Sequence, residues 1–561
     1  MNRAERRKQE KQTGPQALGP LRQTFSQAVA HHQAGRLQQA AELYRQILAE
    51  QPRHADSLHL LGLIAYKTGR LDEAAGLIAD ALQQDSTKTP YCFNLGVVLQ
   101  KQGKLDEAVE AYRRALRLNP SSVEARSNLG NVRLEQGKLD EAEATYRQVL
   151  QQNPNSAEAH NNLGVALKEQ GKFEQAVASY RQALQLNPQH VDAQNNLGVA
   201  LRDQGKLDEA VTSFTQTLAL RPGYVKAHYD RAFAYLWQGQ LDRAVEDLRA
   251  SAETKHNHGW PVQDTTVSKA RVKHDAEQVR YLMERGLLGQ SHAGYLDALE
   301  QLRQRAAQEG GQSWRMPVSP AEFQAIAPSF NRILYYADCP RLPAGALNPS
   351  LDVAGIETRY HAKKPEIMHV DGLLRDEALA SLRRFLLEST IWKRDYPNGY
   401  VGAFLGDGFA CPLLLQIAEE LRLKFPGVFK QHRLMQAWSF KQDNALTGLA
   451  MHADAAAVNV NFWLTPDDAN LDPDHGGLIV WDREAPRDWN FREYNDARKE
   501  PEVLAWLERQ GARAITIPYR QNRAVIFNSD LFHKSDRFRF KDEYESRRLN
   551  VTLLYGRRHD A

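Results

Sequence analysis

The chain has 561 residues, a formal net charge of +3 and an apolar content of 42%. One hydrophobic core cannot serve a chain of this length, so about three domains are expected. The near balance of charge excludes proteins that bind nucleic acid or a membrane surface through a strongly basic face. The cysteines Cys92, Cys339 and Cys411 lie far apart and form no CxxC pair, which argues against a disulfide framework or a thiolate zinc site and fits a reducing cytosol.

The N-terminal residues 1–20 are rich in Gln, Lys and Arg and are predicted to be a disordered basic tail. No apolar segment follows the basic residues, so they are not expected to be a secretory signal peptide. No apolar run approaches the roughly 18 residues that cross a bilayer. The sequence therefore predicts a soluble, cytoplasmic protein without a membrane partner.

Residues 21–258 repeat with a strict period of 34 residues. Three sets of positions keep this spacing: Gly35, Gly69, Gly103, Gly137, Gly171, Gly205 and Gly239; Ala40, Ala74, Ala108, Ala142, Ala176, Ala210 and Ala244; and Pro120, Pro154, Pro188 and Pro222. This period with these residue types is the signature of tetratricopeptide repeats, in which each unit is a pair of helices. One pair cannot bury its apolar face alone, so seven stacked pairs are predicted to form an all-α solenoid.

Asparagines occupy one position in four successive first helices, directly before a Leu-Gly pair. They are Asn94, Asn128, Asn162 and Asn196. Residues at this period form a line along the solenoid, and their amide groups can bond the backbone of an extended peptide. The line resembles the asparagine ladder of O-linked N-acetylglucosamine transferases, which implies a concave groove for a peptide or protein partner. The alternative is that asparagine is merely tolerated on a solvated face.

The repeat period is lost after residue 258. Residues 259–365 are predicted to be a helical and loop-rich connector with two helices within 275–308. In 366–561 aromatic and β-branched residues increase, and helices near 376–386, capped by Asp376, and 411–424 precede a series of strands. The predicted strands are 367–370, 436–440, 458–464, 476–481, 514–518, 523–527 and 548–555. This order predicts a small jelly-roll-like barrel with helices on one side.

Candidate metal ligands lie in this last segment. His452 and Asp454 are separated by one residue, so both project to one side of an extended backbone. His533 follows the strand 523–527 and a loop, which predicts a position at the rim beside a neighbouring strand end. Two histidines and one carboxylate can form a facial triad that binds Fe(II) and leaves coordination positions open.

The last predicted strand carries a candidate anion ligand. Arg548, Asn550 and Thr552 share one face of it, and the opposite face is apolar. An arginine on the inner face of a barrel is costly to bury unless it meets an anion. A carboxylate bound by both arms of the guanidinium would satisfy it.

The order of HxD, the Gly476-Gly477 strand, a distal histidine and an R-x-N strand resembles the 2-oxoglutarate/Fe(II)-dependent oxygenases over about residues 366–558. The resemblance implies a double-stranded β-helix in which His452, Asp454 and His533 bind iron. It also implies that Arg548, with Asn550 where the family usually has serine, binds 2-oxoglutarate. A Trp- and charge-rich insert, about 482–511, would form a lid or a substrate loop.

Other residues compete for each of these roles. Rival carboxylate-binding cations are Lys534, Arg547, Arg557 and Arg558, and rival metal ligands are His475, Asp530 and Asp536, which are expected to be solvated loop residues. Tyr400, Gln436, Trp438, Asn459 and Asn461 are expected to line the pocket or to be packing residues. The predicted function is hydroxylation of a peptide or protein bound by the repeats. The alternatives are a scaffold with a catalytically silent barrel and a barrel that binds metal without 2-oxoglutarate.

Overall fold

The computed structural model describes residues 18–256, 265–308, 313–362, 364–429, 432–443, 450–486, 489 and 494–557. The chain forms two compact units, which divide between Ser213 and Phe214. Most of the predicted tail, residues 1–17, lies outside the described residues, and its last part is helical because helix α2 begins at Leu18. In the described part of the chain, no helix is both long and apolar enough to cross a membrane.

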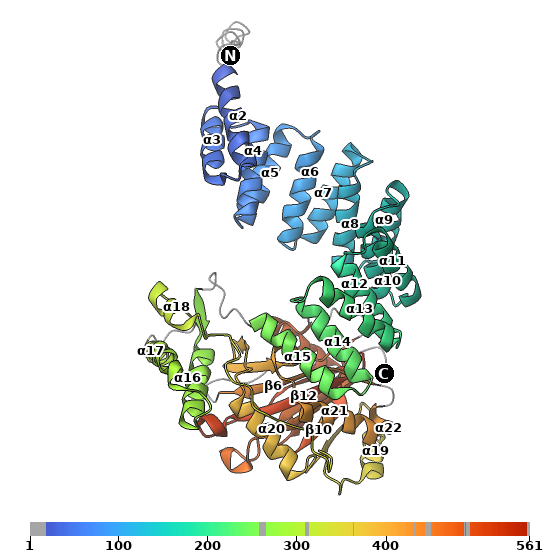
Figure 1. Ribbon diagram of the computed structural model, residues 1–561, viewed down its shortest axis with the longest axis vertical. Coiled ribbons are helices and arrows are strands. Elements are labelled where there is room, and N and C mark those ends of the chain that lie inside the picture. The colour runs from blue at the N-terminus through green and yellow to red at the C-terminus, as the bar shows by residue number, and fades with distance from the viewer. Residues whose placement is uncertain are drawn as a thin grey trace. The chain divides into compact units, whose positions relative to one another are not determined.

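The first unit is the predicted array of helix pairs (Figure 1). Its helices are α2 (Leu18–Gln33), α3 (Leu37–Glu50), α4 (Ala55–Lys67), α5 (Leu71–Gln84), α6 (Thr89–Lys101), α7 (Leu105–Leu118), α8 (Val123–Glu135), α9 (Leu139–Gln152), α10 (Ala157–Glu169), α11 (Phe173–Leu186) and α12 (Val191–Asp203), and α13 (Leu207–Leu220) begins in it. The glycines that separate the two helices of each repeat all have positive φ, between 72° and 79°. Glycine alone adopts this conformation without strain, which explains its recurrence every 34 residues.

A small residue on the first helix faces a large one on the second within a repeat. Gly130 of α8 lies against the buried ring of Tyr146 on α9, and a Cβ at Gly130 would approach that ring to 2.7 Å. Gly96 and Gly164 meet the tyrosines of their own repeats in the same way. The repeating Leu-Gly pair therefore serves the close packing of the two helices.

This packing leads to a stability prediction. Gly130→Ala should lower the free energy of unfolding by about 1–3 kcal/mol, because the ring of Tyr146 must move to admit the methyl group. Gly76→Ala, in helix α5, is the matched control, since a Cβ there meets no atom within 4 Å. It should instead stabilise by about 0.5–1 kcal/mol. Urea unfolding followed by circular dichroism measures both, and equal effects would contradict the packing argument.

The second unit holds three antiparallel sheets, of seven, three and two strands. The strands are β1 (Thr266–Ser268), β2 (Arg315–Pro317), β3 (Ile367–Val370), β4 (Arg394–Tyr396), β5 (Tyr400–Phe404), β6 (Leu434–Gln442), β7 (Val458–Trp463), β8 (Leu478–Glu484), β9 (Ala514–Ile517), β10 (Ala524–Asn528), β11 (Leu531–Ser535) and β12 (Arg548–Tyr555). The seven-stranded sheet has the order β3-β10-β7-β12-β6-β5-β4, the three-stranded sheet β11-β8-β9, and β1 pairs with β2. The predicted strands are all present, whereas the sequence analysis does not predict β1, β2, β4, β5 and β11.

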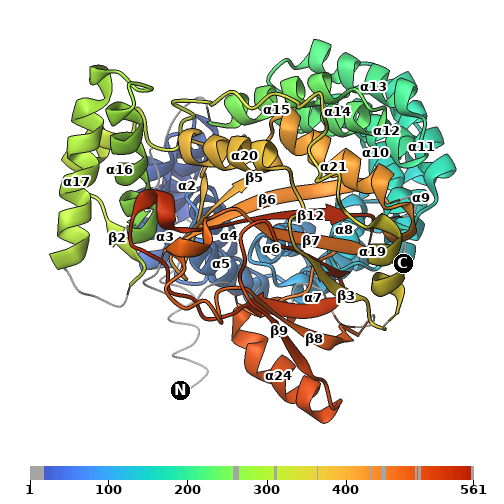
Figure 2. The same cartoon turned by 90° about the horizontal axis from the view of Figure 1, so that it is seen from below.

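The two faces of the seven-stranded sheet pack differently. On one face Trp463, Val525 and Phe527 share a core with Val480 and Leu531 of the three-stranded sheet, so the two sheets lie face to face. The other face packs on helices α20 and α21 (Figure 2). Strand β12 alternates between the two, which confirms the predicted separation of its polar and apolar faces.

The helices of the second unit are α14 (Val225–Trp237), α15 (Leu241–His256), α16 (Lys269–Glu284), α17 (Ala293–Gln308), α18 (Pro320–Ile326), α19 (Val353–His361), α20 (Asp376–Glu388), α21 (Pro412–Lys424), α22 (Pro426–Phe429) and α24 (Glu500–Arg509). Short 3-10 turns are η1 (Gln290–His292), η2 (Leu405–Asp407), η3 (Asp467–Ala469), η4 (Ala497–Lys499) and η5 (Tyr544–Ser546). The prediction that Asp376 caps α20 is wrong: Arg375 is the cap residue, without a side-chain bond, and Asp376 is the first helical residue.

The seventh repeat and the connector belong to the core of the second unit. Phe233 and Leu248 of the last helix pair share that core with α20, α21 and β12. Trp237 of α14 donates from Nε1 to Leu434 O over 3.2 Å. In the connector, Gln278 of α16 donates to the carbonyls of Leu387 and Ser389. The compact units divide before the seventh repeat, and the apolar face of that repeat packs on this core.

Candidate metal centre

The main chain brings two distant segments together at the metal centre. His452 N donates to His533 O over 3.0 Å, and His533 N donates to His452 O over 2.8 Å, which forms an isolated antiparallel bridge. Asp454 N donates to Ser529 O over 3.0 Å. These bonds fix the His-Ala-Asp segment against strand β11 and the residues before it. The sequence predicts His533 after a loop, at a rim beside a neighbouring strand end, and the structure places it within β11 opposite Val480.

The three side chains converge. His452, Asp454 and His533 each offer one ligand atom, and these atoms all lie within 4.8 Å of one another. Asp454 Oδ1 is 3.9 Å from Nε2 of His452, and Oδ2 is 3.5 Å from Nε2 of His533. The side chains of Asp454 and His533 are buried, while that of His452 is 22% exposed. Small rotations suffice for the three atoms to contact one ion, and the centre is reached from the His452 side.

Hydrogen bonds around the three side chains determine which of their atoms remain free to bind a metal ion. Nδ1 of His452 is 2.9 Å from Ala450 O, and Nδ1 of His533 is 3.0 Å from Leu531 O. A carbonyl oxygen only accepts, so Nδ1 of each ring carries the proton and Nε2 keeps a lone pair. This is the usual outer-shell arrangement of a metal-binding histidine. Asn459 Nδ2 donates to Asp454 Oδ2 over 2.6 Å and orients the carboxylate.

The charges of the centre suit a cation. Burial, together with the neighbouring His533, lowers the pKa of His452 below its ordinary value, so its ring is neutral near pH 7. Burial raises the pKa of Asp454, but the neighbouring His533 and His452 outweigh this effect, together with the hydrogen bond from Asn459, and hold the pKa below its ordinary value. Two imidazoles and one carboxylate are a donor set for a divalent transition metal.

Arg548 is a fully buried cation near the Gly-Gly turn. Its Nε donates to Gly476 O over 2.6 Å, and its Nη2 donates to Gly477 O over 3.0 Å. Nη1 donates to Gln442 Oε1 over 2.5 Å. Among the described residues no ion pair joins a carboxylate to this guanidinium, and burial lowers its pKa to about 10. The side chain is therefore desolvated without an anionic partner, which is costly in an isolated chain.

Polar atoms on the same sheet face also lack partners. Asn461 and Trp463 of β7 lie opposite Thr552 and Asn550 of β12, so their side chains share the face that carries Arg548. The buried atoms without a hydrogen-bond partner there are Asn459 Oδ1, Asn461 Oδ1, Trp463 Nε1 and Asn550 Oδ1. Buried polar groups are seldom left unpaired. This face therefore fits a polar, anionic ligand close to the three metal-binding side chains.

The rival ligands have other partners. Arg547 points to the opposite sheet face, as predicted, and pairs with Glu277. Lys534 pairs with Glu500 over 3.1 Å. His475 Nδ1 is 2.8 Å from Asp536 Oδ2. The expectation that Asp530 and Asp536 are solvated is wrong, since both are buried. Arg557 is exposed at the end of the described chain, and Arg558 lies outside the described residues.

The predicted insert contacts the metal-binding segment directly. Asn495 Oδ1 accepts from Ala453 N over 3.0 Å, and its Nδ2 donates to Ala453 O over 2.9 Å. Ala453 is the residue between the two ligands, so this amide fixes the backbone of the HxD motif. Sequence reasoning missed Asn495, because nothing in its local sequence distinguishes it from other insert residues.

An aromatic cluster adjoins the centre on strands β4–β6. Tyr400 and Trp438 pack there with Phe440 and with Ala456, which lies two residues after the candidate metal ligand Asp454. The rings of Tyr396 and Tyr400 stack at 4.4 Å. Of the predicted pocket residues, Tyr400 and Trp438 belong to this cluster, Asn459 and Asn461 lie on the polar face, and Gln436 is exposed. The two strands that complete the cluster, β4 and β5, were not predicted.

The asparagine ladder lies in the first unit as predicted. Its members, Asn94, Asn128, Asn162 and Asn196, are all half-buried on first helices. Hydrogen bonds join successive repeats: Asn162 Nδ2 donates to Asn131 Oδ1 over 3.4 Å, and Asn196 Nδ2 donates to Asn161 Oδ1 over 3.0 Å. Part of their donor capacity is therefore used between repeats, and peptide binding by the remainder stays a prediction.

Comparison with known families identifies the repeats. One tetratricopeptide repeat family matches residues 25–88, 93–157, 128–188 and 161–223, and a second matches 201–258. Residues 25–258 thus consist of tetratricopeptide repeats, which present extended surfaces for peptide or protein partners. Both matches lie before the metal centre. No curated protein matches the sequence.

Several solved structures are similar to part of the chain. MamA is 26% identical with a TM-score of 0.27, over 30% of this chain and 91% of that chain. YrrB, a tetratricopeptide repeat protein with an unusual peptide-binding site, is 23% identical with a TM-score of 0.28, over 33% and 95%. A tetratricopeptide repeat protein from Parabacteroides merdae is 18% identical with a TM-score of 0.38, over 42% and 94%.

Proposed function

We propose that residues 366–561 form an Fe(II)- and 2-oxoglutarate-dependent dioxygenase with a double-stranded β-helix, and that its substrate is a peptide or protein bound by the repeats. The convergence of His452, Asp454 and His533 carries the proposal. When bound there, iron, 2-oxoglutarate and O₂ would supply hydroxylation of a C–H bond, with one oxygen atom in the product, the other in succinate, and release of CO₂.

The side chains of this unit fit both an iron ion and 2-oxoglutarate. His452 and His533 present free Nε2 lone pairs, and Asp454 completes one face of an ion while leaving the opposite side open. The Arg548 guanidinium would bind the far carboxylate of 2-oxoglutarate, which gives a buried cation its missing anion. Asn550 and its neighbours would hydrogen-bond the bound ligand or ordered water, because their amides otherwise stay unsatisfied.

The fold supports the proposal in a second way. The three-stranded sheet packs against the seven-stranded sheet, and the buried aliphatic and aromatic side chains between them exclude water from the neighbourhood of Arg548. A low dielectric strengthens the attraction between a guanidinium and a carboxylate. The partly exposed side chain of His452 leaves an approach for a substrate side chain.

Ligand-dependent stability of the full chain tests the proposal. Mn(II) with 2-oxoglutarate should raise the melting temperature more than Mn(II) alone, and N-oxalylglycine should replace 2-oxoglutarate. Stabilisation by Mn(II) that 2-oxoglutarate does not increase would favour a metal-binding barrel without this co-substrate. Failure of both would favour the scaffold function with a silent barrel. Succinate formation with a peptide that binds the repeats then tests catalysis.

The insert yields a separate prediction. Asn495→Ala should lower Mn(II) affinity by about 10- to 100-fold, the usual cost of losing a group that orients a ligand. Asn495→Asp keeps the acceptor for Ala453 N but loses the donor, so its effect should be intermediate. Calorimetric titration with Mn(II) measures both variants. Unchanged affinity in Asn495→Ala would show that the insert does not position the HxD backbone.

A further inference from the structure

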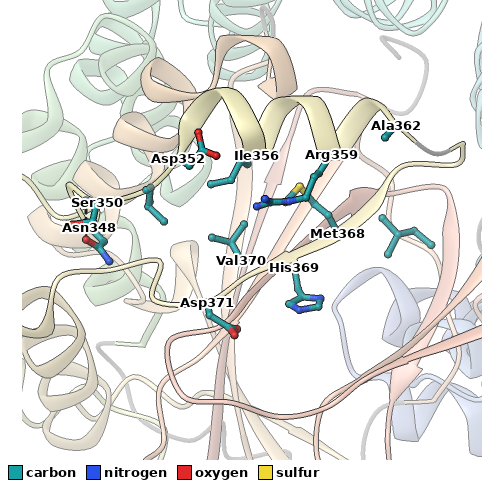
Figure 3. A pocket seen from close by; sticks show the side chains of 12 residues that line it. Asn348, Ser350, Asp352, Ile356, Arg359, Ala362, Met368, His369, Val370 and Asp371 are labelled. Atoms are coloured by element: carbon teal, nitrogen blue, oxygen red, sulfur yellow. Dashed lines mark hydrogen bonds between the residues drawn. The ribbon is translucent and has the colours of Figure 1, made fainter.

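A groove of about 650 Å³ lies between helix α19 and strand β3 (Figure 3). Ile356 of the helix and Met368 and Val370 of the strand form an apolar lining. A groove of this size can accommodate several residues of an extended peptide. We propose that it binds an extended segment of a partner polypeptide that carries a carboxylate and adds as a further strand to β3.

Strand β3 offers the backbone groups for such pairing. Among the described residues it is the edge of the seven-stranded sheet, with β10 as its only partner strand. Asn528 N donates to Glu366 O over 3.0 Å, and by antiparallel alternation Met368 and Val370 also direct their main-chain groups toward β10. Ile367 and His369 then direct theirs away from β10. An edge of this kind is a template for an added strand.

The charges beside the groove favour an acidic occupant. Arg359 of α19 is exposed and, within the described chain, forms no ion pair or side-chain hydrogen bond. Asp352 accepts from Gly355 N as the helix cap, and Asp371 pairs with Arg520 and Arg523. The two carboxylates of the lining are therefore engaged, and the Arg359 cation is available to a ligand.

The shape of the groove favours a single extended segment over a second copy of the chain. Helix α19 flanks β3 along the groove, as Figure 3 shows. The same edge of a second copy would bring its own α19 against this helix. A single added strand would lie about 4.8 Å from β3 and would need no further room. Its alternate side chains would meet the apolar lining, with an acidic residue toward Arg359.

Peptide binding to the full chain tests the proposal. The probes are short fluorescein-labelled peptides that alternate threonine with valine and carry one glutamate or one lysine at each valine position in turn. The best glutamate peptide should bind at least about tenfold more tightly than its lysine counterpart, and Arg359→Glu should reverse this order. Methylation of alternate backbone nitrogens should abolish binding, because it removes the donors that pair with β3.

Two variants of His369 distinguish binding through backbone pairing with β3 from binding through side-chain contacts. His369→Pro removes an N–H that faces away from β10, so it should weaken binding of the glutamate peptide by at least about tenfold while the β3–β10 ladder remains. His369→Val keeps the N–H and should bind as the native chain does. Binding that survives both backbone methylation and His369→Pro would overturn the proposal, as would no binding by any probe. A dimer that His369→Pro dissociates would assign the edge to a second copy instead.

The docking site is independent of the metal centre. His452→Ala should leave peptide affinity unchanged, because His452 lies outside the groove lining. If the chain binds the glutamate peptide but does not consume 2-oxoglutarate, the docking site is supported and the proposed oxygenase function is wrong. If the chain consumes 2-oxoglutarate but does not bind the peptide, the oxygenase function is supported and the docking site is wrong.

Discussion

His452→Ala is expected to abolish metal binding and any turnover of 2-oxoglutarate. The variant removes one of only three protein ligands, so the loss of Mn(II) affinity should exceed the roughly 100-fold cost of losing an outer-shell group. The fold should persist, because the His452 side chain is partly exposed and its one hydrogen bond goes to Ala450 O, two residues away. Calorimetric titration with Mn(II) and an assay of succinate measure the two effects.

His292→Ala is the matched control for this experiment. His292 lies in η1, and its ring bonds only Ser291 and Gly289 nearby. This variant should bind Mn(II) as the native chain does. If His452→Ala retained native affinity, or if both variants lost it equally, the assigned ligand set would be wrong.

Arg548→Met should remove 2-oxoglutarate binding while the metal still binds. Loss of one partner of a buried, hydrogen-bonded charge pair costs about 2–5 kcal/mol, which corresponds to about 30- to 5,000-fold in affinity. In the absence of ligand, the substitution should not lower the stability of the protein. Burial lowers the pKa of Arg548 to about 10, below its ordinary value. The guanidinium is therefore charged in the folded protein at every pH below about 10, and the cost of burying this charge opposes folding there. The melting temperature without ligand should therefore be unchanged or higher.

Arg547→Met is the matched control on the opposite sheet face. Arg547 is buried and pairs with Glu277. Its removal leaves a carboxylate without its partner, so stability should fall by about 3–5 kcal/mol, whereas 2-oxoglutarate affinity should persist. Melting curves with and without 2-oxoglutarate separate the two arginines. Equal loss of affinity in both variants would contradict the role given to Arg548.

The repeats could be predicted in detail because their physics is local. A glycine with positive φ, such as Gly137, and a small residue against a large one, such as Gly130 against Tyr146, recur at a fixed period and need no distant contact. Family comparison then confirmed the repeats. Their predicted end at residue 258 agrees with the family match, but the packing of the last helix pair could not be predicted in this way. The last helix pair keeps the period, yet Phe233 and Leu248 pack on a core built from residues far downstream.

Parts of the candidate centre could be predicted from the sequence, because the alternation along a strand determines to which side each side chain points. Arg548 and Asn550 share a face because they are two residues apart on one strand, as the structure shows. Asn495 and β11 were missed for a different reason. The contact of Asn495 with Ala453 joins an insert to a distant loop, and β11 follows β10 after only two residues of turn-like sequence. Neither leaves a periodic signal.

The central claim is that one metal ion binds between His452, Asp454 and His533. Crystals of the full chain grown with Mn(II) and 2-oxoglutarate, measured for anomalous scattering by manganese, test it most directly. We predict one strong peak at about 2 Å from Nε2 of each histidine and from a carboxylate oxygen of Asp454, with 2-oxoglutarate joining it to Arg548. A peak at His475 or Asp536, or none between the three ligands at saturating Mn(II), would contradict the claim.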